Sequence, residues 1–312
     1  MYLQIIAFIS SFILLAISSY FLVDSLEKIS WFLGLKKFVI GFLVVGLAVS
    51  IPNLFIAINS AHLAVPKLSL GEIFGGNIAI LTLIIGILAL ISRNGLILKC
   101  QLIQKSTIFI LGIVVLPFLL MLDGYLDKAD GIILIFAFFV YSYWLFIKKG
   151  RFKATYTEKV KKTDFFKSLI LLIISLSFLL LSSFSIVETS TFFAEQIGLS
   201  LWVIGLLVVG IFASLPETIF GIHAARAGED ELVIGNLMGS FIGCFTLVLG
   251  ILILIQPFQV DLSPLFLVQV FLTIAAVTFI FFKKTKQRIT QTEGLFLIAF
   301  YFIFFFIQLF VG

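Results

Sequence analysis

The chain has 312 residues, of which 62% are hydrophobic and only 12% are charged, and its mean hydropathy is +1.25. A soluble domain averages about 45–50% apolar and about 25% charged residues, so this composition excludes a soluble globular protein. It also excludes a disordered chain, a collagen and a nucleic-acid-binding protein, and it predicts a polytopic membrane protein. The two cysteines, Cys100 and Cys244, form no pattern typical of a disulfide framework or a metal site.

Ten apolar runs follow one another along the chain, separated by charged and turn residues. A bilayer core of about 30 Å needs about 20 apolar residues per helix, so each run is expected to form one membrane span. The runs cover residues 1–23, 38–62, 69–91, 100–122, 131–147, 165–187, 200–224, 231–255, 262–282 and 294–311. The first run has no basic segment and no small-residue cleavage site, so we expect a retained helix and not a signal peptide.

The basic residues indicate how these spans are oriented. Of the 21 Lys and Arg residues, 19 fall in the odd-numbered loops, and only Lys67 and Lys128 fall in the even-numbered ones. By the positive-inside rule, the odd loops are cytoplasmic and both termini lie outside. The formal net charge of +5 is therefore interpreted as topology and not as a sign of an anionic partner.

An internal repeat relates residues 41–91 to residues 205–255 at a constant offset of 164, with 20 identities in 51 positions. Leu and Ile are frequent in all membrane segments and often match by chance, so the informative matches are those of small and polar residues. These are Gly46/Gly210, Ser50/Ser214, Pro52/Pro216, Gly71/Gly235, Gly75/Gly239, Thr82/Thr246 and Gly86/Gly250.

The two copies of the repeat are predicted to be inserted in opposite directions, because an odd number of helices separates them. Inverted repeats with Gly- and Pro-interrupted helices are typical of secondary transporters, whose substrate binds near the bilayer midplane. Close helix packing alone would also favour glycine, but it does not explain the polar residues beside the prolines. We expect residues 1–147 to form a first five-helix half, 148–164 a basic cytoplasmic linker, and 165–312 a second five-helix half.

Two of the 16 acidic residues, Glu72 and Glu217, fall well within apolar runs. An ionisable residue at membrane depth is costly, so each is a functional hypothesis by default. Glu217 follows Pro216, which has no N–H and frees backbone carbonyls one turn earlier, and Ser214 lies two residues before the proline. Carbonyls, a hydroxyl and a carboxylate together form a hard-oxygen site suited to Na⁺, Ca²⁺ or a proton.

The first copy repeats this pattern with neutral residues, since Ser50, Pro52 and Asn53 stand at the matching positions. On the helices that follow, Ser240 in the second copy adds a hydroxyl and Asn77 in the first copy adds an amide. The glycines beside them are expected to allow the helices to approach closely.

The segments FASLPE (212–217) and GNLMGSFIGC (235–244) resemble the two signature blocks of the cation/calcium exchanger superfamily, of the sodium/calcium exchanger type. The matching segments AVSIPN (48–53) and GEIFGGNIAI (71–80) depart further from the pattern. The resemblance implies a ten-helix inverted frame, with cation ligands at Glu217, Ser214, Ser240 and Ser50. It implies that Asn53 replaces a family acid and that Gly46 and Gly210 offer backbone oxygens to sodium.

The charge of this centre leaves three hypotheses for the ion, because one carboxylate does not neutralise Ca²⁺. The ion is monovalent, or exchange is proton-coupled through Glu217, or Glu72 replaces the missing acid. Glu72 precedes Asn77 by five residues and points roughly 140° away from it on a helix. We therefore expect Glu72 to line a mouth or a helix end and not to bind the ion.

The sequence thus predicts an all-α polytopic membrane protein that acts as a cation antiporter of the alternating-access type. It has no HExxH or GxSxG motif, and we expect no enzymatic activity and no cofactor. The expected partners are the lipid bilayer and small cations, with no nucleic acid and no obligate protein partner. The expected location is the plasma membrane of a prokaryote. The alternative is a non-transporting homologue that serves as an ion sensor or membrane scaffold.

Overall fold

The structure of the protein is a computed structural model that describes residues 2–32, 46–93, 95–98, 107–147 and 162–311. Most of these residues are helical. The first half contains α1 (Tyr2–Phe32), α2 (Gly46–His62), α3 (Pro66–Ala79), the π-helical η2 (Ile80–Ile84), α4 (Ile85–Ile91), α6 (Thr107–Leu120) and α7 (Lys128–Ile147). The second half contains α8 (Lys162–Ile197), α9 (Leu201–Ile204), η4 (Gly205–Val209), α10 (Gly210–Ala213), α11 (Leu215–Ala227), α12 (Asp230–Gly243), η5 (Cys244–Val248), α13 (Leu249–Ile255), α14 (Leu262–Lys286) and α15 (Gln291–Val311).

The helices confirm the predicted fold class. Where the structure describes the predicted apolar runs, they overlap helices or chains of abutting helical segments. Within the described ranges, seven of these segments are long and apolar enough to cross a membrane. Helix α1 extends beyond its predicted run to Phe32, and an ion pair of 2.7 Å between Asp24 and Lys28 joins adjacent turns of this extension. The predicted linker 148–164 lies outside the described residues up to residue 161.

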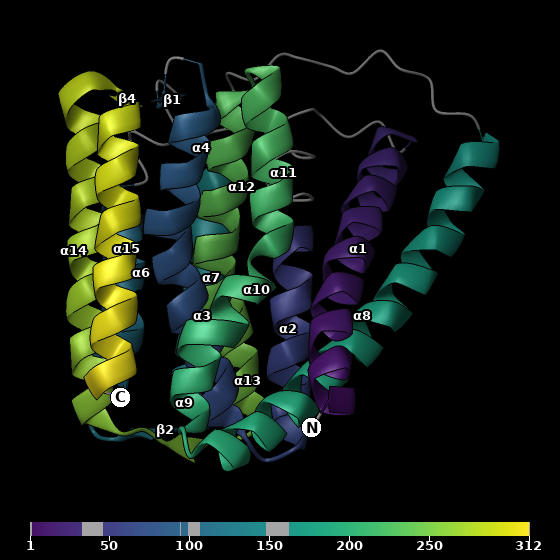
Figure 1. Cartoon of the computed structure of the whole chain (residues 1–312). Coiled ribbons are helices and arrows are strands. Elements are labelled where there is room, and N and C mark those ends of the chain that lie inside the picture. The colour runs from purple at the N-terminus through teal and green to yellow at the C-terminus, as the bar shows by residue number, and fades with distance from the viewer. Residues whose placement is uncertain (1, 33–45, 94, 99–106, 148–161, 312) are drawn as a thin grey trace.

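The two repeats run in opposite directions through the bundle. Figure 1 shows the turn between α2 and α3 at the end of the bundle where both termini lie, and the turn between α11 and α12 at the other end. The π-helical segments η2 and η5 occupy positions that differ by 164 residues, which is the offset of the sequence repeat. The repeat in the sequence is therefore a repeat in the structure.

Two short strand pairs join the halves at opposite ends of the bundle (Figure 1). Strand β1 (Leu96–Ile97) pairs antiparallel with β4 (Arg288–Ile289), and β2 (Tyr125–Leu126) pairs antiparallel with β3 (Phe258–Gln259). Each pair takes one strand from each half of the chain. The all-α prediction did not include these strands.

Glycines allow the closest contacts between helices of different halves. A Cβ atom on Gly86 of α4 would lie 2.7 Å from the carbonyl oxygen of Gly294 of α15. In the same way, a Cβ on Gly250 of α13 would lie 2.9 Å from the carbonyl oxygen of Gly131 of α7. Backbone-to-backbone contact of this kind is typical of membrane helix packing. The hydrophobic effect does not drive helices together in lipid, and small residues allow the close van der Waals packing that does.

Candidate functional site

A helix interruption in the second repeat creates the centre of the candidate site. Helix α10 ends at Ala213, and α11 begins at Leu215 with Pro216 in its first turn. Ser214 between them has φ −86° and ψ 8°, outside the helical region. Figure 1 places α10 near mid-height of the bundle, between α9 and α11. The interruption predicted from Pro216 therefore lies deep within the molecule.

The matching interruption expected at Pro52 is absent from the described helix α2, which is continuous from Gly46 to His62. A proline removes one hydrogen bond, and a helix continues past it as a kink when its flanks are well packed. Both flanks of Pro52 are packed in this way, since Val49 and Ile56 are buried. The first repeat therefore carries its proline within a continuous helix, whereas the helix of the second repeat is interrupted.

Glu217 is held in the interior by Ser240 of the following helix. The Ser240 Oγ donates a hydrogen bond of 2.7 Å to Glu217 Oε1, and both side chains are fully buried. The other carboxylate oxygen, Oε2, has no hydrogen-bond partner among the residues that the structure describes. A buried carboxylate oxygen of this kind is available to a cation.

Asn53 of the first repeat joins the same cluster through Cys244. Its Nδ2 donates a hydrogen bond of 3.1 Å to Cys244 Sγ, which lies 3.9 Å from Ser240 Oγ. The amide oxygen of Asn53 is buried and has no partner within the described part of the chain. The structure thus links Asn53 to Glu217 across the boundary between the repeats.

The serines of the two Pro-containing helices each contact the other repeat. The Ser214 Oγ donates to the Gly210 carbonyl at 2.8 Å, and a Cβ on Gly76 of α3 would lie 3.2 Å from that hydroxyl. Ser50 is placed similarly, since a Cβ on Gly243 of α12 would lie 2.9 Å from its Oγ. Both hydroxyls therefore lie at contacts between repeats that glycines keep open.

Three further predicted residues, Asn77, Gly46 and Gly210, are not part of the cluster formed by Glu217, Ser240, Cys244 and Asn53. Asn77 donates through Nδ2 to the Ile73 carbonyl of its own helix at 2.7 Å, although its Oδ1 has no partner in the described ranges. Gly46 is the first residue of α2, and its role as a backbone ligand stays a prediction. The Gly210 carbonyl, predicted for the same role, accepts the hydroxyl of Ser214.

Two further buried residues belong to this region. Glu72 is 1% exposed, so the expectation that it lines a mouth or a helix end was wrong. It lies in the middle of α3, where Gly205 and Gly210 of the second repeat pack against its backbone. Asn236 is fully buried and its Nδ2 lies 3.5 Å from the Glu217 backbone carbonyl. Asn236 lies on the helix that follows Glu217, at the repeat position that corresponds to Glu72. This correspondence is the sequence signal that would have identified Asn236.

The chemical character of the site is that of a few carboxylates among neutral oxygens. No group of three or more His, Cys, Asp or Glu side chains that would suit a metal ion occurs among the residues described here. The available ligands are carboxylate, amide, hydroxyl and backbone oxygens, which suit Na⁺ and Ca²⁺ better than a transition metal.

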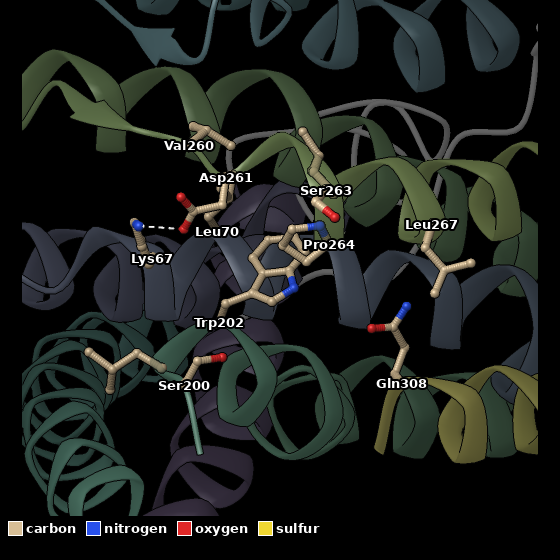
Figure 2. Close-up of a pocket in the computed structure, with 12 residues that line it drawn as sticks. Lys67, Leu70, Ser200, Trp202, Val260, Asp261, Ser263, Pro264, Leu267 and Gln308 are labelled. Atoms are coloured by element: carbon tan, nitrogen blue, oxygen red, sulfur yellow. Dashed lines mark hydrogen bonds and ion pairs between the residues drawn. The ribbon is translucent and has the colours of Figure 1, made fainter. Parts of the chain in front are cut away.

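A separate cavity of about 530 Å³ lies at the end of the bundle that carries the termini. Figure 2 shows the ion pair between Lys67 and Asp261 at this cavity, with Trp202 and Gln308 also lining it. The Lys67 Nζ and Asp261 Oδ2 atoms are 2.6 Å apart and both side chains are partly solvent-exposed. This cavity does not include Glu217 or Ser240.

Comparison with known proteins places this geometry in context. The family model described as sodium/calcium exchanger protein matches residues 3–147 and 167–310. The sodium/calcium exchanger MaX1 of Methanosarcina acetivorans is 27% identical over 92% of this chain and 93% of its own length. An uncharacterized membrane protein of Methanocaldococcus jannaschii is 27% identical over 95% of both chains. A solved structure of the sodium-calcium exchanger NCX_Mj, soaked with Na⁺ and Sr²⁺, aligns with a TM-score of 0.69 and 27% identity, covering 96% of this chain and 97% of that one.

Proposed function

The chain belongs to the sodium/calcium exchanger protein family, and on that premise we propose that it is a secondary-active cation antiporter. It is an integral membrane protein, and relatives of this kind are transporters and not enzymes. We propose that cations bind at the centre formed by Glu217, Ser240 and Asn53, and that the two inverted repeats expose this centre alternately to the two sides of the membrane.

The observation that carries this proposal is the fully buried Glu217 carboxylate, with one oxygen bonded to Ser240 and the other without a partner in the described structure. An unpaired carboxylate in a membrane interior costs several kcal/mol, and it persists only where an ion, a proton or water compensates its charge. A cation that binds Glu217 Oε2 supplies this compensation.

The neutral ligands of the proposed site come from both repeats. Ser214 and Ser240 belong to the second repeat, and Ser50 and Asn53 belong to the first. We assign supporting roles to Asn77, Gly46 and Gly210. Because Ser50, Ser214 and Asn53 contact the other repeat, a change in the angle between the repeats would rearrange the site, as alternating access requires.

The exchanged ions follow from the family and from the ligand set. We propose Na⁺ as the coupling ion and Ca²⁺ as the exchanged ion, with a proton on Glu217 as the alternative coupling species. We also propose that the protein lies in the plasma membrane of a prokaryote, with both termini outside and the 148–164 linker in the cytoplasm.

The first prediction tests this function in proteoliposomes. Vesicles that contain the purified protein are loaded with Na⁺ and diluted into Na⁺-free medium with ⁴⁵Ca²⁺. We expect uptake by the native protein and a loss of at least 90% of the initial rate in Glu217→Gln, because the amide keeps the shape of the side chain but removes its charge, and a tenfold loss already corresponds to about 1.4 kcal/mol.

The matched control is Glu195→Gln, which changes an exposed glutamate at the end of α8. It should transport like the native protein. The same vesicles are assayed with ²²Na⁺ and with a pH-sensitive dye, so that monovalent or proton exchange is detected as well. If the native protein moves none of these cations, the proposal is wrong and the non-transporting alternative is favoured.

A further inference from the structure

The repeat offset reveals a complementary exchange of polar residues between the two copies. Position 53 corresponds to 217, and position 72 corresponds to 236. The first repeat carries an amide at Asn53 and a carboxylate at Glu72, whereas the second carries a carboxylate at Glu217 and an amide at Asn236. Each repeat therefore has one acid and one amide, but in opposite order along the chain.

Burial shows that Glu72 lies in the molecular interior like the other three residues. Its side chain is 1% exposed, and Asn53, Glu217 and Asn236 are 3%, 0% and 0% exposed. In the described part of the molecule, Oε2 of Glu72, Oε2 of Glu217 and the amide oxygens of Asn53 and Asn236 all lack hydrogen-bond partners. Four unpaired oxygens from four helices of the two repeats are an unusual concentration, because buried acceptors are normally paired.

The side chains around Glu217 form a chain of close contacts between the two repeats. The Ser240 hydroxyl donates to Glu217 Oε1 and lies 3.9 Å from Cys244 Sγ, which accepts a hydrogen bond from Asn53 Nδ2. Asn236 also lies at this point, with its Nδ2 3.5 Å from the Glu217 backbone carbonyl. The acid on α11 and the two amides therefore belong to one cluster, and the backbone of Glu72 on α3 lies against α10 beside it.

The glycines around Glu72 explain how it reaches the second repeat. A Cβ on Gly205 would lie 3.0 Å from the Glu72 backbone nitrogen, and a Cβ on Gly210 would lie 3.0 Å from its carbonyl oxygen. The backbone of α3 at Glu72 thus lies directly against η4 and α10. This contact holds the Glu72 residue beside the helix interruption that precedes Glu217.

We infer that Glu72 supplies the second carboxylate of the cation centre, so that the proposed Ca²⁺ ion is neutralised by two acids. This inference rests on the proposed function. Two like charges in a region of low dielectric repel each other, and a divalent cation between them neutralises both and occupies their unpaired oxygens. With Asn53 in place of an acid, Glu217 alone would not neutralise Ca²⁺. Glu72 supplies the second negative charge, because the first repeat carries its acid one helix later than the second repeat does.

The test compares Glu72→Gln, Glu217→Gln and the double variant Asn53→Glu/Glu72→Asn in the ⁴⁵Ca²⁺ uptake assay. Glu72→Gln should raise the half-saturating Ca²⁺ concentration by roughly 100-fold or more, as expected when a carboxylate is removed from contact with a divalent ion. The double variant gives the first repeat the order of the second. It should recover uptake at least tenfold relative to Glu72→Gln, because it restores two acids to the centre.

A second measurement uses only the native protein, so it does not depend on whether the variants fold. The melting temperature of the purified native protein is recorded with CaCl₂, with NaCl and with choline chloride, since a ligand that binds the folded state raises it. Ca²⁺ should stabilise the native protein at concentrations well below those needed for Na⁺. A native protein that transports and is stabilised by Na⁺ but is indifferent to Ca²⁺ overturns the inference while the antiporter function stands.

Two other results are decisive. Transport by Glu72→Gln at native Ca²⁺ affinity shows that Glu72 is a structural carboxyl group and contradicts the inference alone. A native protein without any cation flux contradicts the proposed function itself, whatever the variants do.

Discussion

Ser240 is the residue on which the state of Glu217 depends most directly, because its hydroxyl donates to Oε1 of the buried carboxylate. Hydrogen bonds to charged groups contribute about 1.5–3 kcal/mol, and this bond also fixes the direction of the unpaired Oε2. The second prediction is that Ser240→Ala raises the half-saturating cation concentration for transport by about 10- to 100-fold. The measurement is the initial rate of ⁴⁵Ca²⁺ uptake against Ca²⁺ concentration.

The matched control is Ser182→Ala. Ser182 is as deeply buried, but its hydroxyl bonds to the Leu179 carbonyl of its own helix, α8. This variant should leave cation affinity unchanged. An equal loss of affinity in both variants would mean that Ser240 acts through general stability and not through Glu217.

Single residues also show what the sequence can and cannot predict at this centre. Glu217 and Ser240 are identified by their motif, and the structure brings them within 2.7 Å. The position of Glu72 was misjudged because the helical angle to Asn77 considers neighbours on one helix only. The neighbours that matter for Glu72 come from η4 and α10, more than 130 residues further along the chain. Contacts between residues so far apart in the sequence can be identified only once the fold is known.

At the scale of elements, the contact between α3 and η4 depends on glycines. A Cβ on Gly75 would clash with the Leu206 carbonyl oxygen, and one on Gly71 would clash with that of Trp202. Backbone atoms cannot rotate away as side chains do, so the helices must separate. The third prediction is that Gly75→Ala destabilises the purified protein by about 2 kcal/mol or more and lowers its melting temperature.

Gly112→Ala on α6 is the control, because within the described part of the chain no atom beyond the neighbouring helix backbone lies within 4 Å of the added methyl group. Both variants exchange the same residue types within a helix, where alanine has the higher propensity. Gly112→Ala should therefore melt at or above the native temperature, as measured by thermal unfolding in detergent. A native-like melting temperature for Gly75→Ala would show that α3 and η4 are not in firm contact.

Some elements follow from the sequence and others do not. The apolar runs predict the helices because twenty consecutive apolar residues have few alternatives in a bilayer. The π-helical segments were not predicted. Two of them, η2 and η5, contain Thr82 and Thr246, whose hydroxyls donate to the Ile78 and Ile242 carbonyls four residues earlier. The strand pairs β1–β4 and β2–β3 were not predicted either, because each is two residues long and joins distant segments.

At the scale of the whole molecule, two independent observations support the inverted arrangement. The distribution of Lys and Arg assigns the loop near Lys67 and the loop near Arg226 to opposite sides of the membrane. The structure places the α2–α3 turn and the α11–α12 turn at opposite ends of the bundle (Figure 1). This placement does not depend on the positive-inside rule. The direction of the bundle in the membrane rests on the charge distribution alone.

The fourth prediction tests that direction with Leu63→Cys and Glu229→Cys, two exposed positions in these turns. The background is Cys100→Ser, in which the remaining Cys244 is fully buried. In intact cells, a membrane-impermeant maleimide should label residue 63 and spare residue 229, whereas in inside-out vesicles the pattern should reverse. Permeabilised membranes should label both, which shows that each thiol is reactive. If both positions are labelled from the same side, the inverted repeat is wrong, whereas a reversed pattern in cells contradicts only the outside location of the termini.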